Sequence, residues 1–152
     1  MATLMALPRG TKLVLVAGPL LLVSLFFTWQ NVEIDYGPAG VAATPLDGFD
    51  AWGLLLAVLV AALLTIVILR ELTEVEMSPD IPWEKIALGL GTAAFVVALA
   101  KNVLDDGSSW ESYGFVALAG VVALGAFLDW RAARRTRQPA PTERRRGISS
   151  VV

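Results

Sequence analysis

Acidic side chains supply most of the chemistry that this sequence offers, and they gather in polar segments between apolar stretches. Carboxylates in such number could bind a divalent cation or concentrate cations at the mouth of a pore. Their spacing differs from that of a calcium-binding helix–loop–helix, so we predict no metal site. The simpler interpretation is a solvated face on which Lys101 pairs with Asp105 at i+4. The residues that could form a cation-attracting outer face are Glu33, Asp35, Asp47, Asp50, Asp105, Asp106 and Glu111.

The chain lacks the residue types on which much membrane redox and transport chemistry depends. Its 152 residues include no Cys and no His. Thiol redox centres, Cys-ligated metals and His-ligated haem are therefore excluded. Polar residues near the middle of the apolar stretches are limited to Ser24, Thr65 and Thr92, and each can bond the backbone of its own helix. We predict no catalytic residue, no cofactor and no enzymatic activity.

Four apolar stretches are long enough to cross a bilayer core about 30 Å thick. Apolar residues make up 56% of the chain, and the expected spans are residues 13–29, 51–69, 83–104 and 110–130. The third needs Lys85 and Lys101 to snorkel to opposite interfaces, and a re-entrant or interfacial helix is the alternative. The sequence predicts an all-α membrane domain over residues 1–131, with four transmembrane helices in two antiparallel hairpins. The sequence also predicts that residues 132–152 form a largely disordered cytoplasmic tail.

The distribution of basic residues predicts the orientation of these spans. Of the twelve basic residues, all but Lys101 fall at the termini or in the connection between the second and third spans. Cytoplasmic segments of membrane proteins are enriched in Lys and Arg, so both termini should face the cytoplasm. Tryptophan and tyrosine residues near the span ends fit aromatic belts at both interfaces.

The arginine-rich tail follows the fourth span directly, so its first residues lie at the depth of the lipid headgroups. Arginines near an anionic leaflet gain roughly 1 kcal/mol each. We therefore expect the partners to be the bilayer and its anionic inner-leaflet lipids, while a cytoplasmic protein docked on the tail is the alternative. Nucleic acid is not an expected partner. The arginines expected to contact anionic lipid are Arg131, Arg134, Arg135 and Arg137.

Small residues recur at helical spacing on the third and fourth spans, which lets helix backbones approach closely. Gly91, Ala94 and Ala98 share one face, and Ala119, Ala123 and Ala126 share another. These faces pack either within the chain or against a second copy or another membrane protein. We therefore predict an accessory or scaffold subunit that acts through helix packing. The alternative is a small oligomeric channel or transporter with an acidic vestibule, since four spans alone leave no room for a pore.

The segment Phe26-Phe27-Thr28-Trp29 leaves the first span, and Asp50-Ala51-Trp52-Gly53 enters the second. This pattern resembles small bacterial four-span membrane proteins, which implies a bacterial plasma membrane location. The Ala- and Arg-rich composition is similar to that of such proteins of the high-GC Gram-positive type. The resemblance covers residues 12–131. It implies a four-span membrane fold and transfers no functional residue, because such proteins have no assigned activity.

The orientation can be tested with single cysteines, because the natural chain has none to interfere. Cysteine at Gly40 or Gly107 should react with an impermeant thiol reagent in intact cells. Cysteine at Ser78 or Ala140 should react only after the membrane is opened. Labelling of Gly40→Cys and Ala140→Cys alike from outside would mean that the third span does not cross the membrane.

Overall fold

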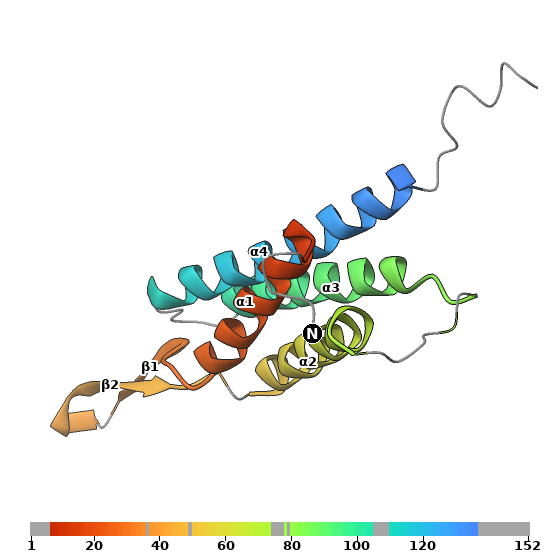
Figure 1. Cartoon of the computed structure of the whole chain (residues 1–152). Helices are drawn as coiled ribbons and strands as arrows, with labels where there is room; N and C mark the ends of the chain where they lie inside the picture. The colour runs from red at the N-terminus through yellow and green to blue at the C-terminus, as the bar shows by residue number, and fades with distance from the viewer. Residues whose placement is uncertain are drawn as a thin grey trace, which may run out of the picture.

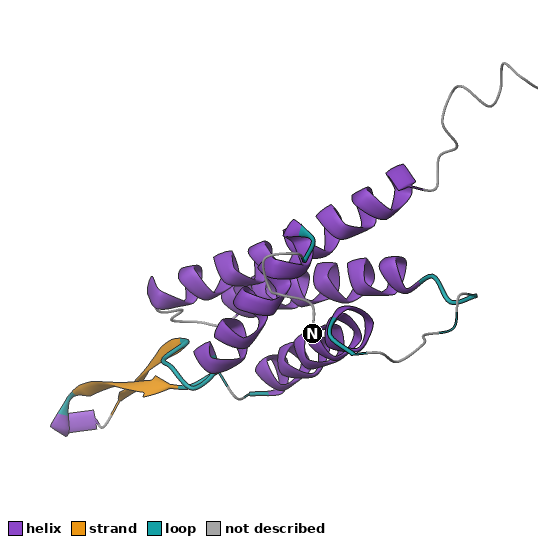
Figure 2. Cartoon of the chain, viewed as in Figure 1, coloured by secondary structure: helices purple, strands orange, loops and turns teal. Residues whose placement is uncertain are grey.

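A computed structural model describes residues 7–35, 37–48, 50–73, 78, 80–104 and 110–136 of the chain. Within this part, four α-helices surround a common core, and one β-hairpin projects beyond their ends (Figures 1 and 2). The helices are α1 (Arg9–Ser24), α2 (Ala51–Glu71), α3 (Trp83–Leu104) and α4 (Trp110–Thr136). The hairpin consists of β1 (Gln30–Asp35) and β2 (Val41–Leu46), with a 3₁₀ turn, η2 (Gly37–Ala39), between them.

The helices pack antiparallel, and helix α4 is central to the packing. It packs extensively against both α1 and α3, and α3 packs against α2 on its other side. Contact between α1 and α2 is smaller. The expectation of two separate hairpins is therefore correct for α3 with α4, whereas α1 associates mainly with α4, the last helix of the chain.

Three of the four helices are long and apolar enough to cross a membrane, namely α2, α3 and α4. This confirms several candidate spans and agrees with a multi-pass membrane protein in a lipid bilayer. Helix α1 is shorter than expected, because it ends at Ser24 rather than near Trp29. Its 16 residues extend about 24 Å, less than a bilayer core of about 30 Å.

The segment expected to be an acidic loop contains the β-hairpin, which the all-α prediction missed. The strands are antiparallel, with Gln30 opposite Leu46 and Asp35 opposite Val41. Gly37 and Gly40 close the turn with φ angles of +63° and +99°, a region that glycine adopts without strain. The sequence signal for a hairpin was the pair of glycines between short segments that contain Val and Ile.

The core is formed by large aliphatic side chains of α1 and α2 and small ones of α3 and α4. Gly91, Ala94 and Ala98 of α3 are buried, as are Ala119 and Ala126 of α4. A Cβ atom added to Gly91 would lie 3.1 Å from the Cβ of Ala126. The small-residue faces thus pack within the chain, which was one of the two outcomes that the sequence allowed.

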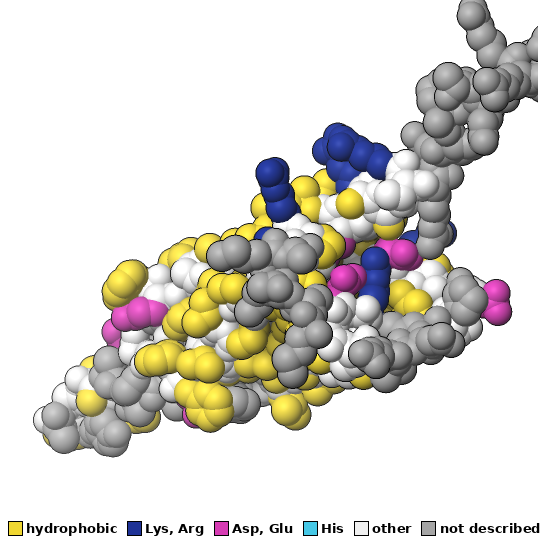
Figure 3. Space-filling model, viewed as in Figure 1, with side chains coloured by type: hydrophobic (Ala, Val, Ile, Leu, Met, Phe, Trp, Pro, Cys, Tyr) yellow, Lys and Arg dark blue, Asp and Glu magenta, His cyan; other side chains and the backbone are white. Residues whose placement is uncertain are grey.

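Large apolar side chains also cover the outside of the helices, where a soluble protein would carry polar ones (Figure 3). The exposed fractions of Val16, Val58, Val96 and Leu124, one from each helix, range from 50% to 61%. Such a surface is stable when lipid chains surround it, because the hydrocarbon is as apolar as the side chains.

Two glycines allow the backbones of α1 and α4 to touch. A Cβ atom at Gly125 would lie 2.8 Å from the carbonyl oxygen of Gly10 and 2.9 Å from the Cγ2 of Val14. A Cβ atom at Gly10 would lie 2.3 Å from the carbonyl oxygen of Gly125. Neither position has room for a side chain, so this contact fixes the distance between the two helices.

We predict that Gly125→Ala destabilises the protein while Gly89→Ala does not. Overpacking at a close contact costs about 1–3 kcal/mol, more than the gain of about 1 kcal/mol in helix propensity. Gly89 is the matched control on α3, because a Cβ atom there meets nothing within 4 Å. Equilibrium unfolding in mixed micelles measures the free energy of unfolding of both variants. Equal stability of the two variants would contradict the close packing of α1 on α4.

Candidate functional site

A lysine lies buried at the end of the bundle from which the hairpin projects. Lys101 is in the last turn of α3 and is 0% exposed. Its Nζ donates to the Oδ2 of Asp50 at 2.5 Å, across 51 residues of sequence. A buried ammonium is costly unless a counter-charge compensates it. The Asp50 carboxylate supplies that charge and joins the start of α2 to the end of α3.

Trp29 covers the same ammonium from a second side. Its ring centroid lies 5.6 Å from the Lys101 Nζ, within the range of a cation–π interaction. The indole Nε1 donates to the backbone carbonyl of Ser24 at 2.9 Å, and the ring packs against Phe115 with centroids 5.0 Å apart. The tryptophan expected in an interfacial belt is thus 2% exposed and encloses the lysine.

Asp50 uses its two carboxylate oxygens for two different purposes. Oδ2 accepts from Lys101, and Oδ1 accepts from the backbone N–H of Gly53 at 2.7 Å, which caps the N-terminus of α2. Partial burial by itself raises the pKa of this carboxyl. The hydrogen bonds from Lys101 and Gly53 outweigh that effect, so the pKa lies below the ordinary value of 3.8. Asp50 therefore stays ionised at neutral pH.

Polar side chains also connect α3 to α4 at this end. The amide of Asn102 donates to the hydroxyl of Ser112, which is buried in the first turns of α4. Lys101 and Asn102 thus bind α2 and α4 from consecutive positions on α3. We call the five residues Trp29, Asp50, Lys101, Asn102 and Ser112 the outer polar cluster, after the orientation that the sequence predicts; the cluster at the other end is named in the same way.

The acidic residues expected to share one outer face lie in different surroundings. Asp50 pairs with Lys101 and is not a free cation-attracting group. Glu33, Asp35 and Asp47 are exposed on or beside the hairpin, and Glu111 is half-buried. The Asp35 carboxylate accepts from the N–H of Gly37 at 2.8 Å. Asp105, the expected partner of Lys101, and Asp106 lie outside the described residues.

No group of three or more acidic residues is placed to hold a metal ion within the described part of the chain. The polar residues expected to bond their own helices do so in two cases. The Ser24 hydroxyl donates to the carbonyl of Leu21 at 2.6 Å, and the Thr65 hydroxyl donates to that of Ala61 at 2.8 Å. These residues therefore need no external ligand to satisfy their hydroxyl groups.

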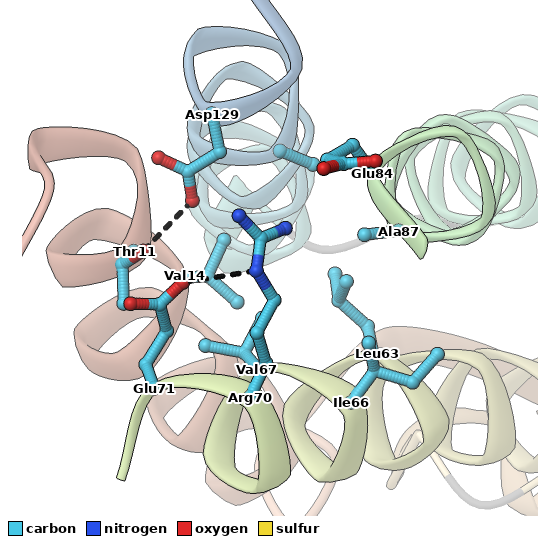
Figure 4. A pocket seen from close by; sticks show the side chains of 11 residues that line it. Thr11, Val14, Leu63, Ile66, Val67, Arg70, Glu71, Glu84, Ala87 and Asp129 are labelled. Carbon is cyan, nitrogen blue, oxygen red and sulfur yellow. Dashed lines mark hydrogen bonds and ion pairs between the residues drawn. The ribbon is translucent and has the colours of Figure 1, made fainter. Parts of the chain in front are cut away.

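A second set of polar side chains gathers at the opposite end, with contributions from all four helices (Figure 4). The Thr11 hydroxyl of α1 donates to the Oδ2 of Asp129 on α4 at 2.9 Å. Arg70 and Glu71 of α2 form an ion pair at 3.1 Å, and the Arg70 guanidinium points between Asp129 and Glu84 of α3. These five residues form the inner polar cluster. They line a cavity of about 20 Å³, enough for one water molecule.

Sequence reasoning missed the inner polar cluster because its members lie far apart along the chain. Asp129 and Thr11 are separated by 118 residues. The available signal was Asp129 itself, an ionisable residue at the end of an apolar stretch, where carboxylates usually have a specific partner. Its partner on α1 could not be read from the sequence, because α1 was expected to pair with α2.

Three of the four arginines expected to contact anionic lipid lie in the last turns of α4. Arg131, Arg134 and Arg135 are all exposed, and Arg137 lies outside the described residues. The guanidinium carbon of Arg134 lies 4.0 Å from the centroid of the Trp130 ring. Helix α4 continues past Arg131 to Thr136, so the described arginines are held on a helix.

No protein-family model, curated protein or solved structure matches the chain. Its chemistry must therefore be inferred from its own geometry. The ionisable residues of the two clusters bind to one another, to hydroxyl groups and to helix ends. These contacts hold the helices at both ends of the bundle and leave the apolar sides to the lipid.

We predict that Asp50→Ala lowers the free energy of unfolding more than Lys101→Met does. Asp50→Ala leaves the Lys101 ammonium buried without its carboxylate and removes a helix cap, which costs about 3–5 kcal/mol. Lys101→Met leaves the Asp50 carboxylate without its partner, but that side chain is already 32% exposed. The loss of stability in Lys101→Met should therefore be less than half of that in Asp50→Ala. The double variant should recover part of the loss of Asp50→Ala, as a double-mutant cycle of unfolding free energies would show.

Two control variants distinguish the effect of losing the Asp50 charge from that of losing the helix cap, and the effect of losing the buried Lys101 from that of losing an exposed lysine. Asp50→Asn keeps a side chain that can cap α2 but removes the negative charge. Lys85→Met removes a lysine that is exposed on the same helix. Additive losses in the double variant would contradict the coupling of Asp50 with Lys101.

Proposed function

We propose that the chain is a non-enzymatic multi-pass protein of the bacterial plasma membrane, an accessory or scaffold subunit that acts through helix packing. The observation that carries the proposal is that the buried charged residues hold the helices together. Lys101 is fully enclosed by Asp50 and Trp29, and Asp50 also caps α2. A lysine held in this way is not accessible to a substrate, and it rigidifies the contact between α2 and α3.

The outer sides of the helices support contact with other membrane helices. Each helix exposes large aliphatic residues along its length, and the small residues of α3 and α4 are largely used inside the chain. Helices associate in lipid by van der Waals packing of complementary surfaces. A rigid bundle with apolar sides presents such surfaces to another membrane protein or to a second copy of the chain.

The proposed orientation places both termini in the cytoplasm. The alternating directions of the helices support it, because α2 begins and α3 ends at the outer polar cluster, whereas Arg70 and Asp129 lie together at the other end. The hairpin then faces outward. Val41 is a better site than Gly40 for outside labelling, because its side chain is 62% exposed and the φ of +99° at Gly40 would strain a cysteine.

The alternative function, an oligomeric channel with an acidic vestibule, has weaker support. Glu33, Asp35 and Asp47 are exposed at the outer end and could attract cations. Asp50 adds little to such a field, because the adjacent Lys101 compensates its charge. Ion flux through reconstituted protein that falls when Asp47 is neutralised would favour the channel.

Site-directed crosslinking in native membranes tests the accessory role. Single cysteines carrying a photoactivatable crosslinker at lipid-facing positions should give discrete adducts with a partner protein or a second copy. Buried positions of the same helices serve as controls and should give none. The lipid-facing positions are Val16, Val58, Val96 and Leu124, and the buried controls are Val14, Val60, Ala94 and Val122.

Purification of the same chain in mild detergent provides a second measurement. The protein should co-purify with a stoichiometric partner or form a defined oligomer. The proposal fails if no lipid-facing position gives an adduct and the purified chain is monomeric and alone.

A further inference from the structure

A cleft of about 560 Å³ opens between the start of α1 and the end of α4. Three arginines surround it, and apolar residues form much of the remaining wall. A volume of this size falls within the range of small-ligand sites, about 300–1,000 Å³. The residues that line the cleft are Pro8, Arg9, Gly10, Leu128, Asp129, Arg131, Ala132 and Arg135.

The three arginines of this cleft have no carboxylate partner among the described residues. Ion pairs join Arg70 with Glu71 and Lys101 with Asp50, and neither pair includes an arginine of the cleft. Asp129 is the one acidic residue of the cleft wall, and its Oδ2 accepts from Thr11. Like charges held together raise the energy of the folded state unless an anion offsets them. The cleft therefore favours a bound anion.

Helix geometry directs two of these arginines, Arg131 and Arg135, into the cleft, and it directs the neighbouring Arg134 away from it. Leu128, Arg131, Ala132 and Arg135 are spaced at i, i+3, i+4 and i+7, which places them on one face of α4. Arg134 is absent from the cleft wall and stacks instead on Trp130. The basic side chains gather at the end of the molecule where α4 finishes (Figure 3).

The position of the cleft along α4 favours a lipid over a soluble anion as its ligand. It begins where the apolar part of the helix ends, next to Trp130, and tryptophan prefers the level of the lipid headgroups. Leu128 and Pro8 add apolar wall on which the glycerol and first methylenes of a lipid can rest. Guanidinium groups bind phosphate oxygens in a bidentate manner and suit such a headgroup.

We infer that this cleft is a binding site for the phosphate headgroup of an anionic phospholipid, held by Arg9, Arg131 and Arg135. The lipid bridges the first and last helices of the chain and neutralises their unpaired charge. This goes beyond a general attraction of the tail to the membrane, because it defines one site of fixed composition. It requires a membrane location and is independent of the accessory role.

Lipid binding to the full-length protein in neutral detergent tests the inference. Native mass spectrometry counts the lipids retained after addition of short-chain phosphatidylglycerol, with phosphatidylcholine of equal chain length for comparison. One phosphatidylglycerol should be retained in preference to phosphatidylcholine. Arg131→Gln with Arg135→Gln should lower the apparent affinity roughly tenfold or more, since each basic contact contributes about a factor of five. Arg9→Gln, on the other helix, should weaken it in the same direction.

Arg134→Gln is the matched control. The sequence predicts lipid contact for Arg134 as well, but the structure stacks it on Trp130 and outside the cleft wall. This variant should therefore leave the affinity of the cleft for phosphatidylglycerol unchanged. An equal loss in this control would indicate diffuse attraction and overturn the site. Equal retention of the two lipids would overturn it as well. Glycerol 3-phosphate and inorganic phosphate are added as competitors. Displacement of the lipid by either at similar concentration would identify a soluble-anion site instead.

Discussion

A fully buried ammonium constrains this protein more than any other single group described in it. Lys101 can occupy its position only if a counter-charge and a polarisable surface surround it, and Asp50 and Trp29 provide them. Each of these residues is held in turn, Asp50 by the N-terminus of α2 and Trp29 by the carbonyl of Ser24. The end of α1, the start of α2 and the end of α3 are therefore fixed relative to one another by one charge.

A second set of polar side chains holds the opposite end of the bundle. Thr11 and Asp129 connect α1 to α4, and Arg70 points toward carboxylates of two neighbouring helices. At this same end Gly10 and Gly125 let the backbones of α1 and α4 touch, and between the two ends small residues of α3 and α4 allow close packing. Polar contacts at the ends and small residues between them suit a bilayer, where burial of apolar surface does not by itself drive helices together.

The sequence predicted the long helices well and the tertiary contacts poorly, for a physical reason. Hydropathy over some twenty residues is a local property, so the bounds of α2, α3 and α4 lie close to those expected. The contact between Lys101 and Asp50 spans 51 residues, and the one between Thr11 and Asp129 spans 118. Nothing local identifies such partners. The end of α1 at Ser24 cannot be read from hydropathy, because apolar residues continue to Trp29, whose ring the structure buries against Lys101 and Phe115.

The buried lysine also affects how the chain can enter a membrane. In the proposed orientation Lys101 is the one basic residue that must cross the hydrocarbon core, which opposes insertion of α3. Asp50, at the start of the preceding helix, reaches the far side with α2. When the two helices enter as a pair, ammonium and carboxylate can travel as a neutral unit at lower cost than a lone cation. The pair that stabilises the finished bundle thereby favours joint insertion of α2 and α3.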